Sequence, residues 1–297
     1  MRESLFITGA TGFVGRRFVE KLELGRYRRI VCLGRTRPAA VPPNVEFIVE
    51  FIQGDLSDTA AYSAALAGCE AVVHLAAATG KTRPETYFQV NLEGTRALVG
   101  ECRRAGVKYL LYISTIAAKF TNQHRYYYAQ SKRRAEEIVS RSGLEYTIVR
   151  PTIVLGKGSP VLVSLARLAN LPVIPVFGNG RALVQPVSVD DLAGCLAAIL
   201  EDPAFAGSTV EIGGPDILSI EELLVKIRGA GPGGARVVHL PARLIAGCVG
   251  MLEKVLLPVL PFTAGQIASF LNDGTVEADA QVARWQAGMQ RVDQMLA

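Results

Sequence analysis

Short apolar runs alternate with helix-like segments through the first half of the chain, and this alternation constrains the fold more than any other feature. The apolar runs span residues 4–8, 29–34, 45–55, 70–77, 108–115 and 144–151, and helical patterns cover 13–24, 84–105 and 126–142. A strand that is followed by a crossover helix returns as a parallel neighbour. The runs are rich in β-branched and apolar residues on both faces, as a sheet buried on both sides requires. The sequence therefore predicts an α/β fold with a doubly wound parallel sheet.

The first apolar run ends in the glycine-rich turn TGATGFVG, residues 8–15. Glycines in this pattern allow a tight turn, a close approach of backbone to a pyrophosphate, and close packing of the next helix. The helix that follows offers free N–H groups and a favourable dipole to an anion. The turn therefore predicts a Rossmann-type dinucleotide site, whose candidate contacts are Gly9, Thr11, Gly12, Phe13, Val14 and Gly15.

The second apolar run indicates which dinucleotide binds. An NAD site usually places Asp or Glu at the end of this strand, to accept hydrogen bonds from the adenosine ribose. The chain instead has Arg35 and Arg37 there, and Arg16 directly follows the third glycine. Guanidinium groups suit a 2′-phosphate. We therefore expect NADP(H) rather than NAD(H), with solvated surface arginines as the alternative interpretation.

Three consecutive tyrosines stand before a helical segment, and one of them has a lysine four residues later. Tyr126 and Tyr127 are followed at that spacing by Gln130 and Ser131, whereas Tyr128 is followed by Lys132. Residues i and i+4 share one helix face. A cation beside the Tyr128 phenol should lower its pKa from about 10 and make it a general acid or base. A chance pairing on one helix face is the alternative.

Together these motifs resemble the short-chain dehydrogenase/reductase superfamily, and the GxxGxxG spacing is similar to its extended and atypical branches. The resemblance covers at least residues 4–200 and includes VQPVSVDDLA, residues 184–193. It implies that Lys132 also holds the nicotinamide ribose hydroxyls. It further implies cofactor contacts at Asp55, Leu56, Ala76, Ala77, Asn91, Pro151 and Ile153.

The same resemblance implies a third catalytic residue, a Ser or Thr hydroxyl at the end of the fifth strand. Ser114 and Thr115 are both candidates. Thr115 precedes Tyr128 by thirteen residues, a spacing similar to that of short single-domain members, and we favour it. Alignment to the longer extended members would instead place the catalytic position at Ile116, which has no hydroxyl.

The pattern loosens after residue 151. We expect residues 1–155 to form the NADP-binding core and residues 156–297 a smaller α/β substrate-binding portion interlocked with it. Helices are predicted at 188–201, at 219–228 and through most of 265–297, with a strand at 209–212. Arg181 and Gln185 lie where extended members often contact substrate; an exposed salt bridge is the alternative.

Residues 240–261, LPARLIAGCVGMLEKVLLPVLP, form a long apolar stretch that Arg243, Glu253 and Lys254 interrupt. A membrane-spanning helix is therefore not expected. A helix packed on the domain and one lying on a membrane surface both stay open.

Composition excludes several other classes of protein. Charged residues make up 20% of the chain and the net charge is +5, with scattered arginines, so neither disorder nor nucleic-acid binding is expected. No metal-ligand cluster is recognisable, so no metal is expected. Five separated cysteines and a short N-terminal apolar run indicate buried reduced thiols in a cytoplasmic protein.

Two functions compete at this stage. The first is an NADP(H)-dependent enzyme that moves hydride to or from a carbonyl or secondary alcohol carbon of a small molecule, by simple reduction or within an epimerisation or dehydration. The short interval before Tyr128 favours a small or apolar substrate. The second is a non-catalytic NADP(H)-binding protein, because the middle and C-terminal segments are similar to the accessory subunit of respiratory complex I, which sits beside a membrane. A homodimer is left open.

Overall fold

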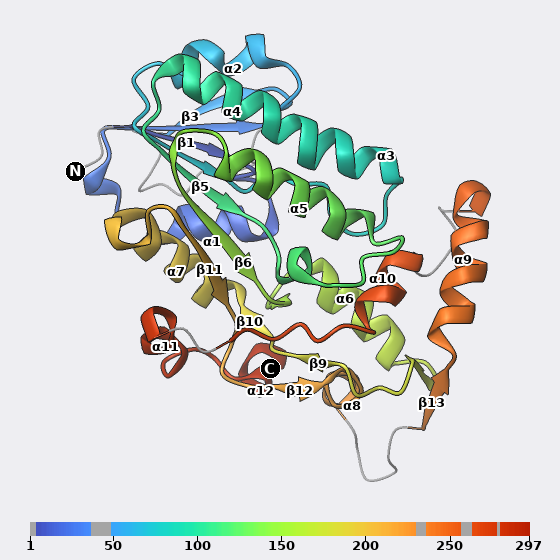
Figure 1. Ribbon diagram of the computed structural model, residues 1–297. Coiled ribbons are helices and arrows are strands. Elements are labelled where there is room, and N and C mark those ends of the chain that lie inside the picture. Colours follow the sequence, from blue (N-terminus) through green and yellow to red (C-terminus); the bar gives the residue numbers. More distant parts are fainter. Residues whose placement is uncertain (1–3, 37–48, 230–235, 257–262, 278–279) are drawn as a thin grey trace.

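The computed structural model describes residues 4–36, 49–229, 236–256, 263–277 and 280–297. Its centre is a seven-stranded parallel sheet in the order β11-β6-β5-β4-β1-β2-β3 (Figure 1). The strands are β1 (Ser4–Thr8), β2 (Arg29–Gly34), β3 (Val49–Gln53), β4 (Ala71–His74), β5 (Tyr109–Ile113), β6 (Glu145–Pro151) and β11 (Ser208–Ile212). The doubly wound α/β prediction is confirmed. Residues 45–48 and Arg37 lie outside the described residues.

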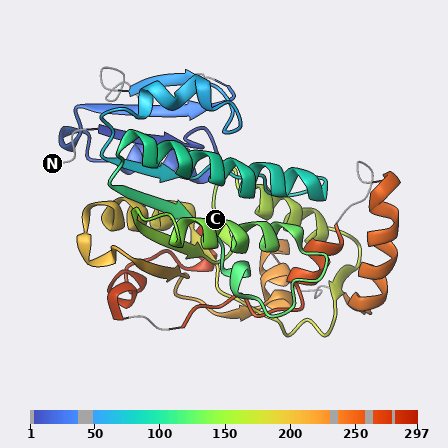
Figure 2. The same ribbon diagram turned by 45° about the horizontal axis from the view of Figure 1, so that its top comes forward.

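Helices cover both faces of this sheet. The two faces are set by alternation along each strand: Leu5 and Ile7 of β1 enter one core cluster, and Phe6 enters the other. The first cluster is covered by α1 (Phe13–Lys21) and α7 (Val189–Glu201). The second is covered by α2 (Thr59–Leu66), α4 (Gly94–Ala105) and α5 (Tyr127–Ser140). Figure 2 shows the resulting three layers.

The helix predicted over 84–105 is interrupted by a π-helical segment. It consists of α3 (Pro84–Tyr87), the π-helix Phe88–Glu93 and α4. Wider π turns are frequent at functional sites because they displace a side chain from its regular position. Here the displaced segment contains Asn91, which is discussed below.

Residues after 153 add small sheets and a third core cluster. Paired strands are β7 (Val154–Leu155) with β10 (Val187–Ser188), β8 (Ile174–Phe177) with β13 (Val237–Leu240), and β9 (Leu183–Val184) with β12 (Leu218–Ser219). Helices α6 (Pro160–Ala169) and α8 (Ile220–Arg228) pack together over them. The sequence did not predict α6, β8 or β13. The C-terminal region contains α10 (Ala264–Ser269), α11 (Ala280–Gln286) and α12 (Val292–Leu296), which are shorter than the pattern suggests.

The apolar stretch at 240–261 contains one helix, α9 (Ala242–Leu256), which packs against α10. Residues 257–261 lie outside the described residues. Within the part of the chain that the structure describes, no helix combines the length and apolar character needed to cross a membrane. Four cysteines are buried, as expected, but Cys248 on α9 is exposed.

Candidate functional site

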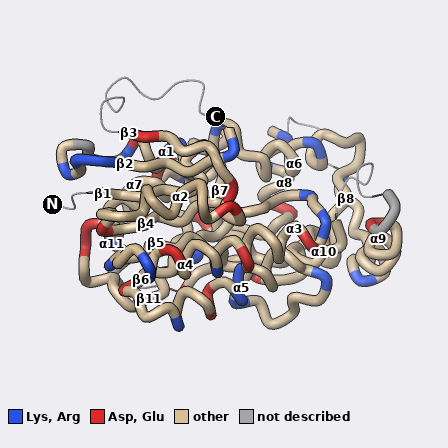
Figure 3. The backbone as a smooth tube through the Cα atoms, turned by 90° about the horizontal axis from the view of Figure 1, so that it is seen from above, with Lys and Arg blue, Asp and Glu red and all other residues tan. Residues whose placement is uncertain are grey.

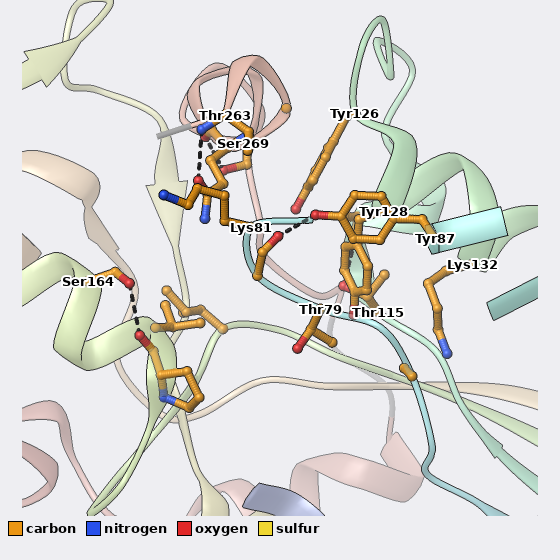
Figure 4. Close-up of a pocket in the computed structure, with 18 of the residues that line it drawn as sticks. Thr79, Lys81, Tyr87, Thr115, Tyr126, Tyr128, Lys132, Ser164, Thr263 and Ser269 are labelled. Atoms are coloured by element: carbon orange, nitrogen blue, oxygen red, sulfur yellow. Dashed lines mark hydrogen bonds between the residues drawn. The ribbon is translucent and has the colours of Figure 1, made fainter. Parts of the chain in front are cut away.

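A cavity of about 1350 Å³ opens at the carboxyl ends of the central strands. The glycine-rich turn after β1 lines one end, and the start of α5 with Tyr126, Tyr127 and Tyr128 lines the middle. Helices α6, α9 and α10 form the opposite wall. Figure 4 shows tyrosine, threonine and serine hydroxyls directed into this space. The location follows the rule for open α/β sheets, in which ligands bind beyond the carboxyl ends of the strands.

The glycine-rich turn has the shape that a pyrophosphate needs. Gly9 has φ +74°, and a Cβ on it would lie 2.5 Å from the Ala76 backbone nitrogen. A Cβ on Gly15 would overlap the carbonyl oxygen of Gly9. Helix α1 begins at Phe13 with neither a side-chain cap nor an acidic residue in its first turn. Its N-terminal N–H groups and dipole therefore remain suited to an anion at this position.

The structure brings only some of the predicted cofactor contacts to the cavity. The lining includes Gly9, Gly12, Phe13, Val14, Gly15, Ala77, Pro151 and Ile153. Arg16 lies outside it and donates from Nε to the Thr11 carbonyl at 2.9 Å. Arg35 is exposed at the end of β2. Asp55 accepts hydrogen bonds from the Ser57 amide and hydroxyl, at 3.1 and 3.0 Å.

Leu56 and Asn91 are both buried, and neither lines the cavity. Leu56 packs in the core beneath α4. The Asn91 amide accepts from Ala78 N at 2.7 Å and donates to Ala78 O at 3.1 Å and Ser131 Oγ at 3.0 Å. Its polar atoms are all engaged with protein. Asn91 therefore links the loop after β4 to α5, and its contact with the cofactor stays a prediction.

A buried histidine extends this network to β1. His74 Nδ1 lies 2.7 Å from Thr8 Oγ1, and Nε2 lies 2.9 Å from Thr95 Oγ1. Thr95 donates its proton to the Asn91 carbonyl, so it must accept from His74 Nε2–H, and Nδ1 accepts from Thr8. Burial, and to a smaller extent the Lys132 charge, lower the pKa of His74 to about 3, so the ring is neutral.

Tyr128 and Thr115 meet in the cavity. The Tyr128 hydroxyl shares a hydrogen bond with the Thr115 side chain, and Thr115 lies between β5 and α5. The ring centroids of Tyr87 and Tyr126 lie 6.0 and 6.1 Å from the ring centroid of Tyr128 (Figure 4). Burial among these rings raises the pKa of Tyr128 to about 12, although the Thr115 hydrogen bond lowers it.

Lys132 is buried beneath this group and does not have the predicted effect on Tyr128. Its Nζ donates to the Ile113 carbonyl at 2.6 Å and lies 4.2 Å from the centre of the Tyr112 ring. Burial lowers the pKa of Lys132 to about 7, against the opposing effect of Glu136. The expectation that Lys132 lowers the pKa of Tyr128 is wrong for this arrangement, because desolvation of the phenol dominates and the ammonium points away (Figure 4).

Ser114 differs from Thr115 in its contacts. Ser114 is a lining residue of the cavity, but its Oγ is buried and has no hydrogen-bond partner among the described residues. Buried hydroxyls are normally paired. Thr115, and not Ser114, is the hydroxyl in contact with Tyr128. The catalytic role of either hydroxyl stays a prediction.

The cavity wall opposite Tyr128 was not predicted from the sequence. Tyr126 is hydrogen-bonded to Ser269 of α10, and Gly250 and Glu253 of α9 also line the cavity. Thr263 and Gln266 form a capping box at the start of α10, and this pattern was the sequence signal that could have predicted the helix.

Arg181 and Gln185 do not line the cavity as the resemblance suggested. Arg181 is exposed. Gln185 is buried and occupied, because it donates to Gly214 O at 2.7 Å and accepts from Val276 N at 3.0 Å.

Comparisons with known proteins agree with this fold. Residues 5–213 match the NAD dependent epimerase/dehydratase family. A ceramide reductase of Caulobacter vibrioides is 33% identical over 198 residues, which cover 66% of this chain and 61% of that protein. Subunit 9 of the NADH dehydrogenase [ubiquinone] 1 alpha subcomplex of Arabidopsis thaliana is 26% identical over 92% of this chain and 71% of its own.

A solved structure shares the fold over nearly the whole length. A nucleoside-diphosphate-sugar epimerase of Staphylococcus aureus superposes with a TM-score of 0.74 at 19% identity, covering 99% of each chain. At this identity the likeness concerns the fold alone. The resemblance to extended short-chain dehydrogenases/reductases is confirmed, and the related proteins include two reductases and an epimerase. The chain belongs to the NAD dependent epimerase/dehydratase family of enzymes.

Proposed function

We propose that this protein is an NADP(H)-dependent oxidoreductase that reduces a carbonyl group to a secondary alcohol, with Tyr128 as the general acid. One observation carries the proposal: the Tyr128 hydroxyl, paired with Thr115, opens into the same cavity as the glycine-rich turn. Residues 1–155 would bind the nucleotide in this proposal, and residues 156–297 would supply most of the substrate wall.

The charge state of Tyr128 favours the reductive direction. A phenol with a pKa of about 12 is protonated at neutral pH, so it can donate a proton to the oxygen of a carbonyl group. Thr115 can donate its single hydroxyl proton to the phenol oxygen, which leaves the phenol proton free for the carbonyl oxygen of the substrate. The bound nicotinamide would supply the hydride. Epimerisation or dehydration by the same residues is the alternative reaction within this class.

The proposed preference for NADP(H) depends on two arginines, one directly after β2 and one in the first turn of α1. Arg35 is exposed where β2 ends, and Arg16 is at the start of α1. Arg35→Ala should weaken NADPH binding about tenfold or more and leave NADH binding unchanged, since only the 2′-phosphate contact is lost. Arg103→Ala, an exposed arginine on α4, is the matched control. Equal weakening of both nucleotides would show that Arg35 does not recognise the phosphate.

The direct test is NADPH oxidation against a panel of aldehydes, ketones and long-chain oxo compounds. Tyr128→Phe should lower kcat by about 10³-fold, because proton donation is lost. Tyr127→Phe is the matched control, since Tyr127 lines the same cavity without a lysine four residues on. If the two variants have equal activity, Tyr128 is not the acid.

A second candidate is a protein that binds NADP(H) without turning it over. The position of the Lys132 ammonium, held by Ile113 and directed away from Tyr128, favours it, as does the similarity to the Arabidopsis NADH dehydrogenase subunit. Tight NADPH binding without oxidation by any member of the panel, in both wild type and Tyr128→Phe, would support this candidate over the first.

A further inference from the structure

The outer face of α9 is a ridge of exposed apolar side chains. It consists of Leu244, Cys248, Met251 and Leu252: Cys248 comes four residues after Leu244, and Met251 and Leu252 come three and four residues after Cys248. Met251 is 73% exposed and Leu244 is 70% exposed, the highest values among the large apolar side chains that the structure describes. Contiguous exposed apolar surface of this kind marks a site of interaction.

The opposite face of α9 is fixed to the protein. Ile245 and Val249 pack in a core cluster with Phe177 and Ile267. The Arg125 guanidinium, from the loop just before the tyrosines, donates to the carbonyls of Ala246 and Gly247 at 3.3 and 3.2 Å. The helix is therefore apolar on both sides but covered on only one. It needs a second apolar environment for its outer face.

Figures 1 and 2 both show α9 at the edge of the molecule, standing out from the body. The exposed apolar side chains of this protruding helix form a ridge. Such a ridge suits insertion between lipid headgroups, where an amphipathic helix buries its apolar face by about 5–10 Å.

Charge around the ridge is suited to an anionic surface. Arg243 on α9 is exposed, and so are Lys81 and Arg83, which line the cavity just before α3. Figure 3 shows both basic and acidic positions at the end of the molecule that holds α3, α9 and α10, and the exposed Glu85 of α3 is one of the acidic residues there. Glu253, the described carboxylate of α9, faces inward and is bound by the Ala264 amide. Basic residues near a membrane surface are attracted by anionic lipids.

We propose that α9 docks the protein on an anionic lipid bilayer, and that the cavity behind it takes acyl-chain carbonyl compounds from that surface. The same helix forms the ridge on its outer face and, through Gly250 and Glu253, a wall of the cavity on its inner face. Apolar side chains continue from this wall into the cavity, namely Phe120, Val161, Leu165, Leu168, Ile220 and Phe270. The substrate class rests on the proposed function, whereas docking does not.

Sedimentation with vesicles tests docking without reference to catalysis. The full chain should bind phosphatidylglycerol/phosphatidylcholine vesicles, and less well at 0.5 M salt or without phosphatidylglycerol. Leu244→Ser with Met251→Ser should weaken binding about tenfold or more, since two exposed side chains no longer enter the bilayer. Ile217→Ser, which removes an apolar side chain that is 56% exposed next to β12, should bind like wild type. Equal binding by all three proteins, or no binding, would overturn the proposal.

Cys248 provides an independent readout, because it lies within the ridge and the other four cysteines are buried. An environment-sensitive fluorophore on Cys248 should shift to shorter wavelength when phosphatidylglycerol vesicles are added. A shift that depends on protein concentration and not on vesicles would show a second copy covering the ridge and would contradict the proposal. Docking with no NADPH oxidation would refute the proposed function alone. NADPH-dependent reduction of acyl-chain carbonyl compounds without docking would refute this inference alone.

Discussion

Burial of Lys132 makes a quantitative prediction about the pH dependence of stability. The side chain is 2% exposed, and its pKa falls from 10.5 to about 7 because burial disfavours the ammonium. Between these two values the unfolded chain holds a proton on Lys132 that the folded chain has released. Since stability rises with pH wherever the unfolded state binds more protons, this lysine should make the folded state more stable as pH rises from 7.

The magnitude follows from the size of the pKa shift. One unit corresponds to about 1.36 kcal/mol, so between pH 7.5 and 9.0 the group should add about 2 kcal/mol to the free energy of unfolding. Lys132→Met removes this contribution. It also removes the hydrogen bond to Ile113, which changes the free energy of unfolding by the same amount at every pH and leaves its slope against pH unchanged.

Urea unfolding of both proteins at the two pH values measures the difference and cancels the titration of all other groups. The wild type should gain about 2 kcal/mol relative to Lys132→Met. Parallel pH dependence in the two proteins would refute the reasoning, because Lys132 would then titrate normally in the folded state.

Three further predictions concern the cavity and its supports. Thr115→Val should lower kcat about 10²-fold in steady-state kinetics, because the hydrogen bond to Tyr128 is lost. Ser114→Ala should keep the free energy of urea unfolding within about 1 kcal/mol of the wild-type value, because the Ser114 Oγ has no partner among the described residues. Gly9→Ala should destabilise by about 2 kcal/mol or more, measured as a lower Tm, because of its positive φ and the Ala76 backbone; an unchanged Tm would contradict this. Asn91→Leu should cost about 3 kcal/mol in urea unfolding by leaving Ala78 and Ser131 unpaired, and a loss below 1 kcal/mol would mean that the network is not structural.

Features with strong local signals were predictable from the sequence. The strands of the central sheet were predictable, because each is a short apolar run closed by a glycine, a proline or a polar residue. The glycine-rich turn was too, because its spacing directly reflects backbone geometry at Gly9 and Gly15. The choice of Tyr128 among three tyrosines followed from the single lysine at helical spacing.

Features that depend on long-range packing were not predictable. The pKa of Tyr128 is set by Tyr87 and Tyr126 around it, and these neighbours come together only in the fold. Asn91 resembles a ligand contact in sequence, but the π-helix turns its amide to Ala78 and Ser131. The α9–α10 wall is formed by residues more than 120 positions from the loop it covers, as the Arg125 contact to Ala246 illustrates.

The most direct test of the proposed function is transfer of deuterium from C4-labelled NADPH to a carbonyl carbon. The account predicts that the wild type forms a product alcohol that carries the label, and that Tyr128→Phe forms it about 10³-fold more slowly with an unchanged Kd for NADPH. Tight binding of NADPH by the wild type with no label in any product, or full transfer by Tyr128→Phe, would contradict the role of Tyr128 in catalysis.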